Sequence, residues 1–207
     1  MSNTDVGKIT VFNSVLAMSN GAGKLVGELG KMLDMAERLF GPRECWRSIE
    51  GIKFWQNDPQ ILFPNGYSRP EIIIRLRLTS CFNAACYELA HETVHLLAPI
   101  RIENVTNLEE GIACYFATHY MKEGLGLDWR IKKPADDATP AERERYYAYK
   151  QALNVVTPQL EKHRGGLLKL RTPWRRFGDI RPEELRVAFA DLNLSDAEFL
   201  AGPFGQN

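Results

Sequence analysis

The sequence predicts an α+β fold: a small, mostly antiparallel sheet packed on two helices, with a helical carboxy-terminal part. Three observations support this prediction. Short stretches rich in β-branched and aromatic residues occupy 51–56, 60–64 and 71–78, with turn residues between them. Apolar residues recur at helical spacing from Asn83 onward and again from about Asn107. The last third of the chain is rich in charged residues and helix-start signals, which favours further helices.

The first elements follow from local periodicity. Residues 22–40 place apolar side chains at helical spacing and end at Gly41 and Pro42, so we expect an amphipathic helix there. The stretch 71–78 alternates in a manner typical of a strand with one buried face. The side chains expected on that buried face are Ile72, Ile74, Leu76 and Leu78.

The remaining elements are mainly helical. We expect a helix from Asn83, as its N-cap, to a stop at Pro99, and a second helix over 107–122. Cys86, Leu89, Ala90, Thr93, Leu96 and Leu97 form the expected packing face of the first one. Further elements are a loop over 132–139, a long charged helix over 141–163, and short helices within 181–192 and 195–204.

Length and charge limit the possible classes of protein. A chain of 207 residues suits a single domain over 1–207, with a core at about 45–125 and a helical extension at about 139–207. Lys and Arg together equal Asp and Glu, so no global field favours nucleic acid or a membrane as partner. The local basic run Lys169, Arg171, Arg175 and Arg176 is more often solvated surface than a binding site.

The cysteines and the amino-terminal stretch indicate the compartment. The four cysteines, Cys45, Cys81, Cys86 and Cys114, form neither a CxxC pair nor a disulfide framework, so we expect reduced, mostly buried thiols. The apolar stretch 9–19 is interrupted by Asn13 and Ser14, and it suits a secretory signal poorly. No segment is apolar over the length needed to span a bilayer. The cytoplasm is therefore the expected location.

One pentapeptide carries chemistry. His91-Glu92-Thr93-Val94-His95 is an HExxH motif inside a segment that is predicted to be helical on independent grounds. Residues i and i+4 share one helix face, so His91 and His95 can offer two imidazole nitrogens to one zinc ion. Glu92 is then placed to act as a general base on water activated by the metal. The alternative is a histidine pair on a solvated helix face.

A catalytic zinc site normally has three protein ligands, so a third is expected downstream. Glu110, on the next predicted helix, is the favoured candidate. Two alternatives stay open: Glu110 serves only in a capping box with Asn107 as N-cap, or Glu109 is the ligand. Asn107 and Glu109 are also candidates for orienting the histidines.

The HETVH segment followed by LEEGIACYFA (108–117) resembles the gluzincin branch of the zincin metallopeptidases. The likeness covers about 72–120. It implies His91, His95 and Glu110 as zinc ligands and Glu92 as general base. In zincins an edge strand borders the cleft and pairs with extended substrate, and 71–78 is the expected counterpart, which favours a peptide or protein substrate.

The chain departs from that family at two points. Thermolysin-like members carry an acidic residue four positions after the ligand Glu, whereas Cys114 stands here, so Asn107 or a backbone carbonyl is expected to hold His91. The family's oxyanion stabiliser is a Tyr or His beyond the second helix. Tyr146, Tyr147 and His163 are the candidates for that role, and His119 is a poorer one.

These observations predict a zinc-dependent hydrolase, most simply a metallopeptidase. The alternative is a non-catalytic zinc-bearing regulatory or interaction module on a zincin-like fold. An intact general-base position favours the enzyme, because purely structural zinc sites are usually closed by four protein ligands. The sequence indicates no oligomeric state.

Overall fold

The computed structural model describes residues 10–12, 21–44, 46–56, 58–100, 104–129, 133, 135–171 and 175–205. The expectations for Cys45, for most of 9–19 and for part of the loop 132–139 lie outside these ranges.

A four-stranded sheet has the order β1-β2-β4-β3. Its strands are β1 (Thr10–Phe12), β2 (Ser48–Trp55), β3 (Gln60–Leu62) and β4 (Glu71–Arg77). β2 pairs in parallel with both β1 and β4, and only β3 pairs antiparallel, with β4. The α+β class is confirmed, but the sheet is mixed and not mostly antiparallel. Local turn signals predict successive hairpins, whereas the chain passes through β3 and returns so that β4 lies between β3 and β2.

This strand order also corrects the expected edge strand. β4, predicted as the edge, is paired on both sides, and β1 and β3 are the two edge strands of the described sheet. Ile72, Ile74 and Leu76 of β4 are buried as expected, while Leu78, just beyond the strand, is 48% exposed.

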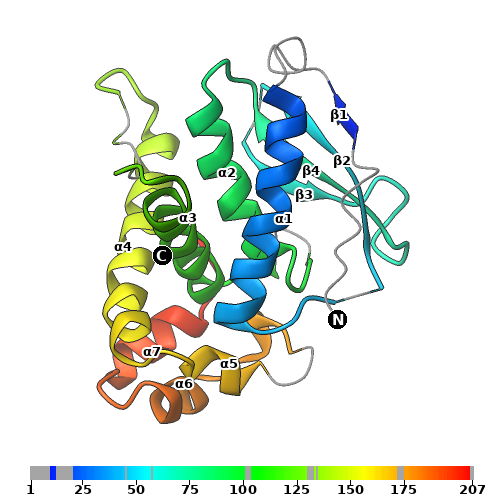
Figure 1. Ribbon diagram of the computed structural model, residues 1–207. Helices are drawn as coiled ribbons and strands as arrows, with labels where there is room; N and C mark the ends of the chain where they lie inside the picture. Colours follow the sequence, from blue (N-terminus) through cyan, green and yellow to red (C-terminus); the bar gives the residue numbers. More distant parts are fainter. Residues whose placement is uncertain are drawn as a thin grey trace.

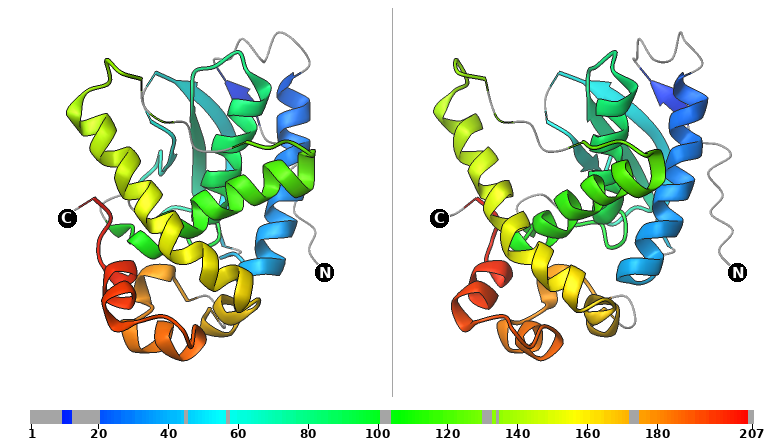
Figure 2. Two further views of the ribbon diagram at one scale, coloured as in Figure 1. Left: turned by 90° about the vertical axis from the view of Figure 1, so that its left-hand side faces the viewer. Right: turned by 60° about the vertical axis from the view of Figure 1, so that its left-hand side comes forward.

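The helices cover one side of the sheet and extend away from it (Figure 1). They are α1 (Gly21–Phe40), α2 (Phe82–His95), α3 (Asn107–Leu125), α4 (Pro140–Lys162), α5 (Gly166–Leu170), α6 (Pro182–Ala188) and α7 (Leu194–Ala201), with a 3-10 turn at Phe177–Asp179. α1 and α2 lie against the sheet, and α4 crosses α3 and packs against it (Figure 2). α5 to α7 gather at one end of the molecule.

The helix starts differ slightly from the expected caps. α2 is capped at Cys81, not Asn83, and no side chain caps it. α3 is capped at Thr106, not Asn107, because the Thr106 hydroxyl accepts from the backbone N–H of Glu109. α4 begins with a full capping box between Thr139 and Glu142, which fixes where this charged helix starts.

One cluster of buried apolar side chains holds these layers together. It includes residues from Leu25 on α1 to Leu200 on α7. α1 precedes the predicted core range of 45–125, yet Leu25, Leu29 and Leu33 are fully buried in this cluster. All six residues of the predicted packing face of the HExxH helix are buried. Within the described residues, no helix combines the length and apolar character needed to cross a membrane.

The basic run beyond α5 is used within the fold. The guanidinium of Arg171 is fully buried and donates to the backbone carbonyls of Phe40, Gly41, Pro42, Leu97 and Arg175. Burial lowers the pKa of Arg171 to about 10. Arg175 pairs with Glu184, and Arg176 lies 3.7 Å from Glu44. Arg171 therefore joins the ends of α1 and α2 to the carboxy-terminal part.

We expect Arg171→Leu to lower the free energy of unfolding by about 3 kcal/mol, because it leaves several buried carbonyls without a donor. Arg186→Leu, at an exposed position of α6, is the matched control and should change it by less than about 0.5 kcal/mol. Urea denaturation followed by circular dichroism measures both. Equal stabilities of the two variants would contradict the role assigned to Arg171.

Candidate metal centre

Helix α2 brings the two imidazoles of the HExxH motif together. His91 and His95 lie one turn apart, and their Nε2 atoms are 3.3 Å from each other. Their side chains are 13% and 11% exposed, so both remain within reach of solvent. The two Nε2 atoms point towards a shared position, as the helical spacing predicts.

Helix α3 supplies a carboxylate to the same position. The Oε2 atom of Glu110 is 3.0 Å from Nε2 of His91 and 3.7 Å from Nε2 of His95. In a tetrahedral zinc site with bonds of 2.0–2.1 Å, ligand atoms lie about 3.3 Å apart. Oε2 is also buried without a hydrogen bond in the described structure. The three atoms thus have the separations that a single zinc ion requires.

Glu92 lies beside this group but in a different relation to it. Its carboxylate and the two histidines offer atoms within 4.8 Å of one another, and the residue is only 3% exposed. Its Oε2 has no hydrogen-bond partner among the described residues. Burial raises the pKa of Glu92 to about 7, against the opposing effect of the two histidines. Glu110 Oε2 is close to both Nε2 atoms, so the structure brings two carboxylates, those of Glu92 and Glu110, to the histidine pair.

The two histidines are oriented by unlike partners. Nδ1 of His95 lies 2.7 Å from Oε1 of Glu109, so a carboxylate holds this ring and sets its tautomer. Nδ1 of His91 lies 3.8 Å from the thiol of Cys114, a weaker partner. Asn107 does not hold His91 as expected. Its amide donates instead to the carbonyl of Phe199 on α7.

The two neighbouring acidic residues of α3 make different contacts. Thr106 and Glu109 have capping-box spacing, but the carboxylate of Glu109 contacts His95 and does not return to the helix start. Glu110 is not the acid of a capping box with Asn107, because Asn107 lies inside the helix. Glu109 therefore contacts Nδ1 of His95, whereas Glu110 lies beside the Nε2 atoms of both histidines.

Tyr149 is the residue that sequence reasoning missed. Its ring meets that of His91 edge to face, with 5.8 Å between centroids. Burial and the carboxylate of Glu110 raise its pKa well above the ordinary value, which keeps the hydroxyl protonated as a donor. A signal was present, because Tyr149 is in helical phase with the buried residues of α4, which are Ala152, Val156 and Leu160.

The close approach of α4 to α3 depends on Gly111. A Cβ atom at Gly111 would lie 2.8 Å from the backbone carbonyl oxygen of Ala152. Only glycine allows α3 and α4 this contact. Tyr149, one turn before Ala152, is thereby brought over His91.

The predicted oxyanion stabilisers lie elsewhere. Tyr147 is 58% exposed and stacks edge to face on Tyr146, which precedes Tyr149 by nearly one turn. His163 ends α4, fourteen residues or about 21 Å along the helix from Tyr149, and contacts Asp191 and Phe189. His119 stacks on Tyr115. None of these four rings contacts His91 or His95 in the described structure.

The charges of His91, His95 and Glu110 affect one another strongly. Burial opposes a charged imidazole, but Cys114 and Glu110 outweigh it and raise the pKa of His91 to about 10. The pKa of His95 is also raised, because Glu110 and Glu109 outweigh the effect of burial. Burial would raise the pKa of Glu110, but His95 and His91 lower it to about 2.

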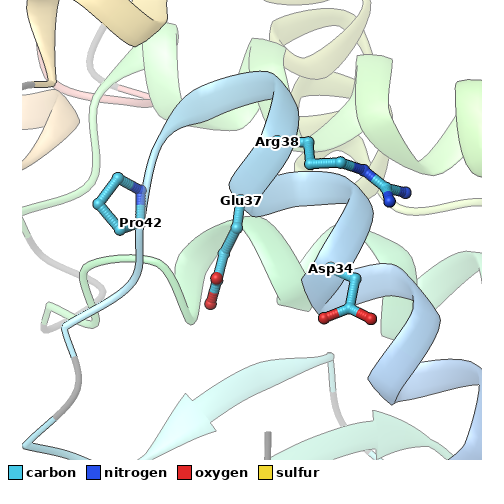
Figure 3. A pocket seen from close by; sticks show the side chains of 4 residues that line it. All are labelled: Asp34, Glu37, Arg38 and Pro42. Carbon is cyan, nitrogen blue, oxygen red and sulfur yellow. The ribbon is translucent and has the colours of Figure 1, made fainter. Parts of the chain in front are cut away.

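A separate depression of about 300 Å³ lies on α1 (Figure 3). Asp34, Glu37, Arg38 and Pro42 line it. It contains no residue of the metal group, and Glu37 is engaged with Arg43 at 3.3 Å. We assign no ligand to it.

Comparison of the chain with protein-family models, with curated proteins and with solved structures finds no match. The interpretation of the site therefore rests on its own geometry.

Any zinc ion bound by this group should be held more tightly as the pH rises. Zinc binds neutral imidazole, and below a pKa of about 10 His91 holds a proton that must leave, as does His95. Each displaced proton adds about a factor of ten per pH unit. Competition with a chromophoric chelator at pH 6, 7 and 8 measures this, and an affinity independent of pH would contradict it.

Glu109→Gln should weaken zinc binding by about 10- to 100-fold, because the neutral amide holds His95 less strongly than a carboxylate does. The control is Glu123→Gln, at a 53% exposed side chain on the same helix, which should bind zinc like the wild type. The same competition assay compares them. Equal affinities for the two variants would remove Glu109 from the site.

Proposed function

We propose that this protein is a zinc-dependent hydrolase, and specifically a metallopeptidase. The observation that carries the proposal is the convergence of two imidazole nitrogens and one carboxylate oxygen, separated by 3.0–3.7 Å, beside a second buried carboxylate. Three protein ligands leave a fourth position for water or substrate, as catalytic zinc sites require. The resemblance to gluzincins, based on the HExxH and Glu-Gly elements, supports the same ligand set.

His91, His95 and Glu110 would hold the ion. A bound zinc ion acts as a Lewis acid and makes water more acidic. Glu92, which is buried beside the two histidines, would accept a proton from the attacking water and return it to the leaving amine. The protonated hydroxyl of Tyr149 donates a hydrogen bond to the developing oxyanion. Glu109 and Cys114 orient the two histidines.

A peptide substrate fits the surroundings of the site. β3 is one of the two edge strands of the described sheet, and it contacts α2, the helix that carries the HExxH motif. An extended peptide can add to such an edge through backbone hydrogen bonds, which favours a peptide over a small ester. We place the protein in the cytoplasm, in accordance with its thiol content.

Metal analysis and one substitution test the proposal. The wild type should carry about one zinc per chain, while His91→Ala and Glu110→Ala should lose it. Glu92→Gln should retain zinc but cleave peptides about 10²- to 10⁴-fold more slowly, because the amide cannot accept the proton. Mass spectrometry of a peptide library after incubation, with and without chelator, measures cleavage.

Two outcomes would contradict this proposal. Full activity in Glu92→Gln would remove Glu92 from the mechanism. Stoichiometric zinc without any turnover would favour a non-catalytic zinc-bearing module.

A further inference from the structure

The segment after α7 reaches the metal centre from the far end of the chain. Both views of Figure 2 show it running beside α4. The backbone N–H of Phe204 donates to the carbonyl of Val105 at 2.9 Å, and that of Asn107 donates to the carbonyl of Gly202 at 3.0 Å. The two segments thus pair antiparallel at Thr106 and Pro203. Residues 202–204 are fixed against the start of α3, the helix that carries Glu109 and Glu110.

This pairing places an aromatic ring against Tyr149. The ring centroids of Phe204 and Tyr149 are 4.7 Å apart and tilted by 40°. The Tyr149 ring also meets the His91 ring edge to face. Tyr149 is therefore held between Phe204 and a histidine of the metal group. Such aromatic contacts have preferred geometries and restrict the orientation of a ring.

α4 alone does not fix this tyrosine. Most of its N-terminal half is exposed, Tyr149 is half-buried, and its fully buried residues begin at Ala152. The turn carrying Tyr149 lies at the boundary between the solvated and the packed halves of the helix. Phe204 provides an apolar neighbour there from outside the α3–α4 contact.

We infer that Phe204 is a positioning residue, which holds the Tyr149 ring against His91 of the metal group. The catalytic consequence rests on the proposed function, whereas the placement of the ring does not. The carboxy-terminal segment is then part of the site. Its backbone pairs with the start of α3, and the side chain of Phe204 fixes the ring of Tyr149.

Nitration of tyrosines by tetranitromethane, mapped by peptide mass spectrometry, tests the placement without using activity. In Phe204→Ala, Tyr149 should be nitrated severalfold faster than in the wild type, while the already exposed Tyr147 serves as internal reference. Phe204→Tyr should restore the slow rate. Leu194→Ala, at a 48% exposed position that begins α7, is the control and should leave the rate unchanged. An unchanged rate at Tyr149 in Phe204→Ala overturns the inference.

Kinetics test the consequence. Phe204→Ala should retain zinc and lower kcat about 10-fold, with KM nearly unchanged, because a displaced donor is lost mainly in the transition state. In a Tyr149→Phe background the same substitution should have no further effect on kcat. Equal losses in both backgrounds overturn the inference. A wild type with no peptidase activity refutes the proposed function instead, and the nitration rates still decide the role of Phe204.

Discussion

The approach of α3 to α2 is the constraint on which the site depends. A helix fixes the spacing of two imidazoles by itself, but a group of three possible donors forms only when a third one meets their nitrogens. Glu110 does so with an oxygen 3.0 Å from His91, at the side of the pair that faces away from Glu109. In the folded protein, Glu109 thus contacts the Nδ1 side of His95, while Glu110 contacts the Nε2 side of the histidine pair. These two neighbours in sequence contact different nitrogens because successive side chains of a helix point in different directions.

Further elements stabilise that approach in turn. The bare backbone at Gly111 lets α4 contact α3, and the contact carries Tyr149 over His91. Pairing of the last described residues with 105–107 fixes the point where α3 starts. The residues that surround the metal group therefore come from α2, α3, α4 and the segment after α7. The carboxy-terminal third is a structural part of the centre and not an appendage to it.

How much could be predicted from the sequence depended on whether the signal was local. The helix bearing His91 and His95 followed from periodicity within a few turns, and the burial of its packing face is confirmed. The pairing of β2 with β4 could not be derived, since it joins strands separated by β3, and turn residues give no information on such order. Periodicity did not single out Tyr149 from Tyr146 and Tyr147, for a related reason. All three lie on one charged helix, and only the phase set by Ala152 and Val156 distinguishes the ring that points inward.

The buried guanidinium of Arg171 has a consequence for motion. It bonds to carbonyls at the ends of α1 and α2 as well as within its own segment. A hinged opening of the carboxy-terminal helices away from α1 would break these bonds and strand a charge among apolar side chains. These helices should therefore stay fixed relative to α1, and amide hydrogen exchange in them should require global unfolding. The mostly exposed amino-terminal half of α4 is then the more mobile side of the molecule.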